Sequence, residues 1–149
     1  MNTSLTVYED VTLITLQNIP ADIRFIADVF EQIGSMGVDV DMISLSPVQS
    51  SRTSLSFTIN DDDLVNILSY TSKLDDGSVR SIVSNGNCKI SINDESMVNS
   101  PGFAAKVFAL VADAKAEIRL ITTSESQISV LVTKADFNEV YAKLGTLAE

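Results

Sequence analysis

The segment Ala105-Lys106-Val107-Phe108 repeats the earlier segment Ala27-Asp28-Val29-Phe30, and the same spacing follows each of them. Ile121 lies thirteen residues after Phe108, just as Ile43 lies thirteen residues after Phe30. A further β-type run then follows, at residues 55–59 in the first copy and 128–132 in the second. Ordered self-similarity over this length indicates one structural unit that occurs twice in the chain.

Each copy has the pattern strand, helix, strand, strand, helix. Short alternating runs rich in Val, Ile and Thr predict the strands, and apolar residues at helical spacing predict the helices. In the first copy we expect strands at residues 11–16, 38–45 and 55–59 and helices near residues 23–33 and 64–71. In the second copy we expect strands at residues 89–93, 118–123 and 128–132 and helices near residues 101–115 and 135–147.

The two copies differ in how their sheets can close. The first copy has a closing strand available at residues 79–84, whereas the second copy ends in a helix. Residues 4–8 form a β-type run before the first copy, so we expect them to complete the sheet of the second unit. The alternative is a frayed N-terminal extension. The predicted fold is therefore α+β, two βαββαβ units with antiparallel sheets and helices on one face, comprising residues 9–84 and residues 85–149 plus 2–8.

The composition excludes several classes of function. The chain has 20 acidic and 10 basic residues, and a net charge of −10 repels the phosphate backbone of nucleic acid. Histidine is absent, which removes the usual general base at neutral pH and the commonest zinc ligand. There is also no glycine-rich phosphate-binding motif. We therefore expect no catalytic residue, no metal, no cofactor and no nucleic-acid partner, and the protein is not predicted to be an enzyme.

Features of location and local structure give further expectations. No apolar run reaches the length of about 18 residues that would indicate a membrane span, and no basic region typical of a secretory signal opens the chain. We expect a cytoplasmic protein without membrane contact.

Cys88 is the only cysteine and is expected to be a small buried strand residue. The acidic clusters at residues 61–63 and 75–76 are expected to cap a helix and to form a turn, respectively, and not to bind calcium.

The ordered set of motifs resembles the ACT domain pair in the regulatory region of aspartokinases. The closer match is in the second copy, in the runs Ser100-Pro101-Gly102-Phe103-Ala104-Ala105-Lys106-Val107-Phe108 and Ile118-Arg119-Leu120-Ile121-Thr122-Thr123. The resemblance covers nearly the whole chain. It implies two ferredoxin-like ACT units in a homodimer that serves amino-acid biosynthesis, with the last unit closed by the segment before the first. No segment resembles the kinase domain, so the resemblance implies regulation. The chain is then expected to be either a regulatory part of an aspartokinase or the partner of a kinase catalytic chain.

The resemblance also implies where an amino acid effector would bind. In such pairs the effector lies at the interface between units, where it is held by the loop after the first strand, the start of the first helix and the second strand. A helix N-terminus offers N–H groups to a carboxylate. The implied site residues in the second copy are Met97, Asn99, Ser100, Pro101, Gly102, Phe103, Ala104, Glu117 and Ile118. The alternatives are that residues 100–102 are a plain helix start and that Glu117 is a solvated residue at the start of a strand.

The first copy departs from the family pattern. Ile23 and Arg24 stand where the family has Pro-Gly, and Leu45 and Ser46 stand where it commonly has Gln and Asn. The implied site residues in this copy are Asp22, Arg24, Asp39 and Val40. Asp22 could bind an ammonium group or cap a helix, and Arg24 could pair with an effector carboxylate. The first site is therefore expected to be altered or empty.

The sequence thus predicts an amino-acid-sensing regulatory module. Lysine and threonine are the candidate effectors that the resemblance implies, and homodimerisation is expected. The alternative is a ligand-independent dimerisation or assembly module whose effector sites have decayed.

Overall fold

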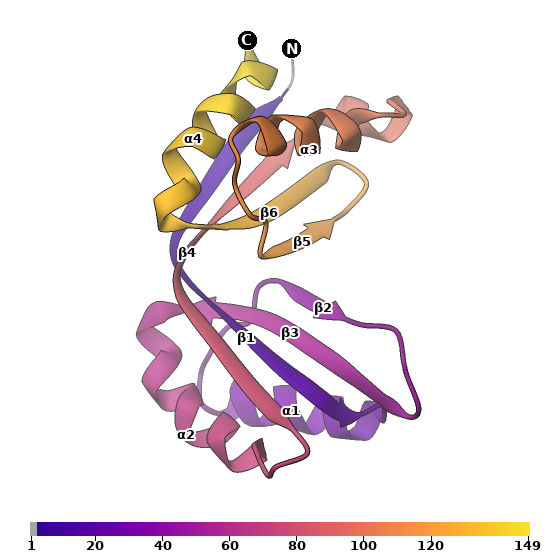
Figure 1. Cartoon of the computed structure of the whole chain (residues 1–149), viewed down its shortest axis with the longest axis vertical. Helices are drawn as coiled ribbons and strands as arrows, with labels where there is room; N and C mark the ends of the chain where they lie inside the picture. Colours follow the sequence, from indigo (N-terminus) through magenta and orange to yellow (C-terminus); the bar gives the residue numbers. More distant parts are fainter. Residues whose placement is uncertain (1–2) are drawn as a thin grey trace. The chain divides into compact units, whose positions relative to one another are not determined.

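The computed structural model describes residues 3–149, which form two compact units (Figure 1). The first unit comprises residues 10–85, and the second comprises residues 3–9 together with residues 86–149. These bounds lie one residue from the predicted 9–84 and 85–149 plus 2–8. Asn2, which the predicted second unit included, lies outside the described residues. None of the helices within residues 3–149 is long and apolar enough to cross a membrane.

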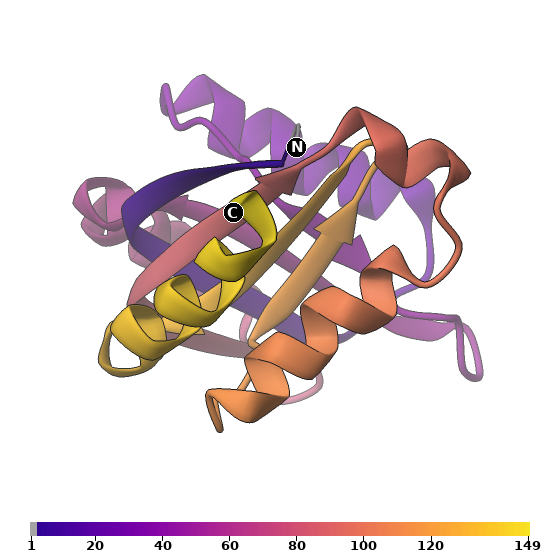
Figure 2. The same cartoon turned by 90° about the horizontal axis from the view of Figure 1, so that it is seen from above.

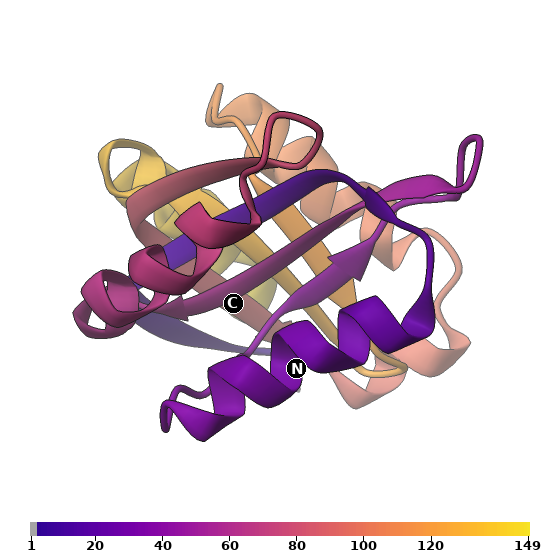
Figure 3. The ribbon, with the colours of Figure 1, turned by 90° about the horizontal axis from the view of Figure 1, so that it is seen from below.

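The first unit is a sheet with two helices on one face (Figure 3). Its elements are the second part of β1 (Ser4–Pro20), α1 (Ile23–Ser35), β2 (Ile43–Leu45), β3 (Arg52–Asn60), a short 3-10 helix η1 (Asp61–Asp63), α2 (Leu64–Leu74) and the first part of β4 (Arg80–Asn93). β3 pairs antiparallel with both β1 and β2. The helices and the sheet enclose an apolar core in which Phe57 is fully buried and contacts Phe30 edge-on, with 5.6 Å between the ring centroids.

The second unit repeats this arrangement with α3 and α4 on one face of its sheet (Figure 2). Its elements after β4 are η2 (Glu95–Asn99), α3 (Phe103–Asp113), β5 (Leu120–Thr123), β6 (Gln127–Thr133), α4 (Lys134–Gly145) and η3 (Thr146–Ala148). β6 pairs antiparallel with β4 and β5. The complete strand order is β2-β3-β1-β4-β6-β5. The prediction of two ferredoxin-like units is confirmed.

The N-terminal part of β1 completes the sheet of the second unit, as predicted from the strand count. The Thr3 hydroxyl donates to Asp94, and Asn93 Nδ2 lies 3.3 Å from the hydroxyl of Thr6. Lys89 Nζ lies 5.0 Å from the centre of the Tyr8 ring. Later positions in β1 thus meet earlier positions in β4, so these segments run antiparallel. Leu5 also packs against the core of the second unit.

The strand boundaries differ from the prediction in several places. The strands predicted at residues 38–45 and 118–123 are shorter, since β2 is Ile43–Leu45 and β5 is Leu120–Thr123. The runs predicted at residues 4–8 and 11–16 merge into β1, and those predicted at residues 79–84 and 89–93 merge into β4. Asp10 and Gly86 lie between the predicted runs and have left-handed φ values of 57° and 69°. A single left-handed residue can bend a strand as a bulge does without ending it. The sequence pattern therefore predicted the end of a strand at these positions, whereas β1 and β4 each continue through them.

The acidic clusters have only partly the roles that the sequence predicted. Asn60, and not an aspartate, accepts the N-cap hydrogen bond of η1 through its side chain. Asp61 instead accepts a hydrogen bond from the Thr12 hydroxyl, and Asp63 makes no side-chain cap at α2. In the second cluster Asp76 does organise a turn, as predicted. Cys88 is buried in β4 and is 2% exposed.

Candidate functional site

A pocket of about 350 Å³ lies in the second unit where the chain enters α3. Four of the predicted effector-binding residues line it, namely Ser100, Pro101, Gly102 and Phe103. The other lining residues are Thr3, Asp94, Ser96, Lys106 and Leu147. Thr3 and Leu147 are near opposite ends of the chain, and the start of β1 and the end of α4 lie close together in Figure 1. The pocket therefore depends on the N-terminal strand that closes this unit.

Asp94 forms one wall of the pocket and is held by three hydrogen bonds. Its Oδ1 accepts from the backbone N–H of Ser96 at 2.9 Å and from the Ser96 hydroxyl at 2.6 Å, which caps η2. Its Oδ2 accepts from the Thr3 hydroxyl. These donors, the Ser96 hydroxyl first and the Thr3 hydroxyl second, lower the pKa of Asp94 below its usual value. At neutral pH this wall of the pocket is therefore negatively charged.

The loop of residues 100–102 forms the second wall. The backbone N–H of Ser100 donates to Met97 O at 3.3 Å, and that of Phe103 donates to Ser100 O at 3.2 Å. Gly102 has a φ of 91°, which glycine adopts at little cost and other residues rarely adopt. It is the N-cap of α3 and contributes no side-chain hydrogen bond to the helix. The pocket consequently faces a helix N-terminus that no side chain caps, where the macrodipole favours negative charge.

Lys106 gives the pocket a positive charge one turn into α3. Its side chain is exposed, and its backbone N–H donates to Gly102 O at 3.1 Å in the first turn of the helix. The pocket thus combines the carboxylate of Asp94 with a helix N-terminus and an ammonium group. This arrangement suits a small ligand that carries both charges, such as a free amino acid. Within residues 3–149 no group of three or more His, Cys, Asp or Glu side chains could hold a metal ion.

The remaining predicted residues of the second copy do not line this pocket. Met97 is half-buried and packs against the core, as does Ile118. Asn99 and Ala104 are exposed. Glu117 is also exposed, and its backbone N–H donates to Asp136 at 3.4 Å.

Sequence reasoning missed five lining residues. Asp94-Glu95-Ser96 has the pattern of a helix cap, and that pattern was a usable signal for two of them. Lys106 lies one helical turn after Gly102, and that spacing was a usable signal for its place beside the loop. Thr3 and Leu147 had no local signal, because only the folded sheet and helices bring them to residues 94–106.

The four predicted residues of the first copy are not gathered into one site. Asp22 is the N-cap of α1 and accepts from the backbone N–H of Arg24 at 2.9 Å. Arg24 lies 2.9 Å from Asp28 and 2.9 Å from Glu31, and these carboxylates raise its pKa, with the hydrogen bond to Glu31 as the largest cause. Asp39 is exposed, and Val40 packs against the core of the first unit.

Comparisons with known proteins identify relatives of the chain. The family described as ACT domain matches residues 90–146, which include the loop and α3. The aspartokinase of Geobacillus stearothermophilus is 32% identical over 126 residues, which are 84% of this chain and 30% of that protein. An aspartokinase of Bacillus sp. strain MGA3 is 27% identical over 131 residues. The chain thus spans about 30% of the length of the curated relatives that it matches.

Solved structures give the same result for the fold. The regulatory subunit of aspartate kinase from Thermus thermophilus, in a ligand-free form, superposes with a TM-score of 0.79 at 28% identity. That match covers 93% of this chain and 95% of the subunit. Aspartate kinase from Synechocystis superposes with a TM-score of 0.89 at 27% identity, over 96% of this chain and 26% of the enzyme.

Proposed function

Because the chain is a tandem ACT-domain protein that resembles the regulatory region of aspartokinases, we propose that it senses a free amino acid and passes the signal to a kinase catalytic chain. The observation that carries this proposal is the pocket at the start of α3. It combines the loop of residues 100–102 with the negative charge of Asp94 and the positive charge of Lys106. The chain itself contributes regulation and no phosphoryl transfer.

The chemistry of the pocket supports an α-amino acid as ligand. The α-carboxylate would lie at the N-terminus of α3, where the Lys106 ammonium adds a second favourable interaction. The α-ammonium group would face the Asp94 carboxylate and the hydroxyl oxygens of Ser96 and Ser100. A volume of about 350 Å³ falls within the usual range of small-molecule sites, about 300–1,000 Å³. Lysine and threonine are the first ligands to test.

The proposed signal is a shift between two arrangements of a homodimer in the cytoplasm. The edge strand β2 carries the apolar side chains of Ile43 and Leu45, which are 50% and 52% exposed, and this supports association through that unit. A ligand shifts such an equilibrium only by the difference between its affinities for the two states. The effector must therefore bind one dimer arrangement more tightly than the other.

Thermal unfolding in the presence of each of the twenty amino acids tests the sensing function. A ligand at a hundred times its dissociation constant stabilises a folded protein by about 2.7 kcal/mol, which is readily measured as a raised melting temperature. We expect one or a few amino acids to have this effect. If none does, lysine and threonine included, the sensing function is wrong.

The variant Lys106→Gln tests the location of the site. Loss of the ammonium group should weaken binding of the amino acid by about tenfold, because one charge-assisted interaction with the carboxylate disappears. The matched control is Lys134→Gln, which removes an exposed lysine of the same unit at the start of α4, away from the pocket. Equal affinities in the two variants would place the ligand elsewhere.

A second candidate function is a ligand-independent assembly module. The observation that favours it is in the first unit, where Asp22 caps α1 and Arg24 is bound to Asp28 and Glu31. The side chains of Asp22 and Arg24 therefore already interact with α1 itself. Sedimentation with and without amino acids separates the two functions, since an assembly module forms the same dimer under both conditions.

A further inference from the structure

The start of β1 is joined to one wall of the amino acid pocket by a buried carboxylate. Asp94 is 7% exposed, and Thr3, which is 8% exposed, donates its hydroxyl to Asp94 Oδ2. Both residues line the pocket at the start of α3. Thr3 lies 91 positions before Asp94 in the chain, so this hydrogen bond is not a local feature of a turn. A ligand bound to Asp94 in this pocket therefore lies next to the beginning of β1.

The hydrogen bonds of Asp94 leave room for a ligand on the side of Thr3. Oδ1 already accepts two hydrogen bonds, from the backbone N–H and the hydroxyl of Ser96. Among the residues that the structure describes, Oδ2 accepts one, from the Thr3 hydroxyl. A carboxylate oxygen has two lone pairs, so an ammonium group can bind Oδ2 without displacing this hydroxyl. The ammonium group and the hydroxyl then share one oxygen atom.

The position of Asp94 is set by the second unit and not by β1. Its backbone N–H donates to Ser126 O at 2.9 Å, in the turn between β5 and β6, and its carbonyl oxygen accepts from the Met97 N–H at 3.1 Å. Thr3, by contrast, lies at the beginning of a strand, where order depends on the contacts that tie the chain down. Of the two partners, Asp94 is therefore fixed, and the order of Thr3 can change.

Few contacts hold the residues that follow Thr3. Residues 4–8 form the outer strand of the second sheet, and an outer strand has main-chain hydrogen bonds on one side only. Thr6 and Tyr8 are exposed, whereas Leu5 is half-buried and packs against the core. The hydrogen bond between Thr3 and Asp94 is therefore a large part of what holds the start of this strand.

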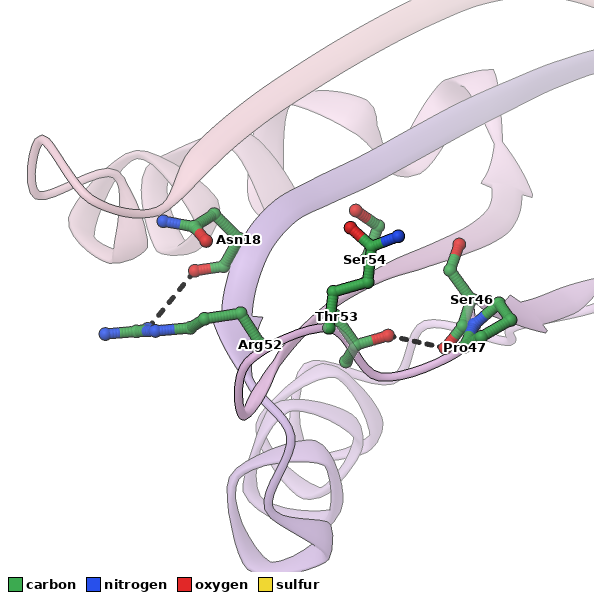
Figure 4. A pocket seen from close by; sticks show the side chains of 7 residues that line it. Asn18, Ser46, Pro47, Arg52, Thr53 and Ser54 are labelled. Atoms are coloured by element: carbon green, nitrogen blue, oxygen red, sulfur yellow. Dashed lines mark hydrogen bonds between the residues drawn. The ribbon is translucent and has the colours of Figure 1, made fainter.

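The far end of β1 is fixed in the first unit. Asn18 donates through Nδ2 to Ser78 O at 2.8 Å, and its carbonyl oxygen accepts from Arg52 Nη1 at 3.2 Å. Figure 4 shows the Arg52 side chain beside Asn18, next to the hairpin between β2 and β3. Ile14, nearer the middle of the strand, is fully buried. A ligand at the start of β1 can thus change the order of residues 4–8, while the rest of the strand stays in place.

We propose that Asp94 couples the amino acid pocket to β1, so that a bound amino acid orders residues 4–8. This inference rests on the sensing function proposed above and adds the path by which occupancy of the pocket is read. The ammonium group of the amino acid binds Asp94 Oδ2 next to the Thr3 hydroxyl, and its contact with Thr3 ties the start of β1 to the filled pocket. Asp94 is the positioning residue in this coupling.

The coupling has two consequences for regulation. Coupling between two sites is reciprocal, so order at residues 4–8 strengthens binding in the pocket by the same factor. The edge of a sheet is also a template for pairing with another chain, so the order of this edge strand is a signal that a partner can read.

Amide hydrogen exchange of residues 4–8, measured by NMR with and without an amino acid, tests the coupling. L-threonine and L-lysine are the first probes, and the other protein amino acids follow at the same concentration. The melting temperature of each sample shows whether the amino acid binds. We expect an amino acid that raises the melting temperature also to slow exchange at residues 4–8 by about fivefold or more, the lower end of the usual coupling between two sites.

The variant Thr3→Val removes the hydroxyl that meets Asp94 and nearly keeps the size of the side chain. The same amino acid should still raise its melting temperature, but exchange at residues 4–8 should no longer become slower. The matched control is Thr6→Val, which makes the same substitution in the same strand at a hydroxyl that contacts Asn93 and not Asp94. This control should show the slower exchange of the native protein.

The outcomes separate the coupling from the sensing function. If an amino acid raises the melting temperature of the native protein without slowing exchange at residues 4–8, sensing stands and the coupling is wrong. If Thr3→Val shows the same slower exchange as Thr6→Val, another contact orders the strand, and the role of Asp94 is wrong. If no amino acid raises the melting temperature, the sensing function is wrong and the coupling fails with it.

Discussion

The carboxylate of Asp76 shows how single residues stabilise the connection between α2 and β4. Its Oδ1 accepts from the backbone N–H groups of Ser78 and Val79, both at 3.0 Å, and from the Ser78 hydroxyl at 2.8 Å. These donors, the N–H of Val79 first, lower the pKa of Asp76 from 3.8 to about 2. Gly77, between the carboxylate and its donors, has a φ of 91°. The turn therefore depends on an ionised aspartate followed by glycine.

We predict that Asp76→Asn destabilises the protein at neutral pH and that the effect disappears in acid. A folded-state pKa below 3.8 means that ionisation favours folding. This contribution is present above pH 3.8 and is lost as the pH falls through about 2. Urea denaturation of the native protein and the variant between pH 7 and pH 2 measures the difference. The control is Asp62→Asn, since the Asp62 side chain accepts no hydrogen bond within residues 3–149. A difference that does not change with pH would contradict the prediction.

The element that shapes the second unit is β1, which begins in this unit and ends in the first. Its N-terminal residues are bound to the end of β4 through Thr3 and Thr6, and Leu5 packs against the core of the second unit. A strand of 17 residues thus supplies an edge to one sheet and a central strand to the other. The start of β1 and the end of β4 are distant in sequence, and these hydrogen bonds join them directly.

We predict that Leu5→Ala lowers the free energy of unfolding by about 1–2 kcal/mol. A fully buried leucine costs about 2–5 kcal/mol when truncated to alanine, and Leu5 is only half-buried. Urea denaturation followed by far-UV circular dichroism measures the effect. Ser4→Ala is the control because Ser4 is exposed on the same strand. If Leu5→Ala is as stable as Ser4→Ala, residues 4–8 do not contribute to this core.

On the scale of the whole molecule, two strands are common to both units. β1 and β4 are neighbours in the sheet, and each has residues in the first unit and in the second. Unfolding one unit would therefore disrupt strands that the other unit requires. This differs from two domains on a flexible linker, which lose their structure separately.

We predict that the two units unfold as one cooperative structure. Ile14→Val in β1 and Ile90→Val in β4 each truncate a fully buried residue, one in the core of each unit. Each should cost about 0.5–1.5 kcal/mol, which corresponds to about 2- to 13-fold faster amide exchange. Each variant should accelerate the slowest exchanging amides of both β3 and β6. Acceleration confined to the strand opposite the substitution, β3 for Ile14 and β6 for Ile90, would show that the units open separately.

The candidate site could be predicted in part. The family resemblance implies the loop Ser100-Pro101-Gly102 as a site, whereas its local signals indicate only a helix start, because proline and glycine restrict or permit backbone conformations at fixed offsets from it. Asp94 and Lys106 are near in sequence but were not assigned. Glu117 and Ile118 were expected on the facing strand, whereas the structure places the backbone of Glu117 against Asp136 and Ile118 in the core.

The sequence by itself determined the repeat, the type and order of the main helices and strands, and the closure of the second unit by residues 4–8, because periodic burial of apolar side chains is written locally in each element. The tertiary structure alone decided that four predicted strands are two long ones. It also decided that Thr3 and Leu147 reach the loop at residues 100–102, and that Asn18 meets Arg52 beside the hairpin. These features depend on the register between distant strands and on single left-handed residues, which the spacing of apolar residues does not encode.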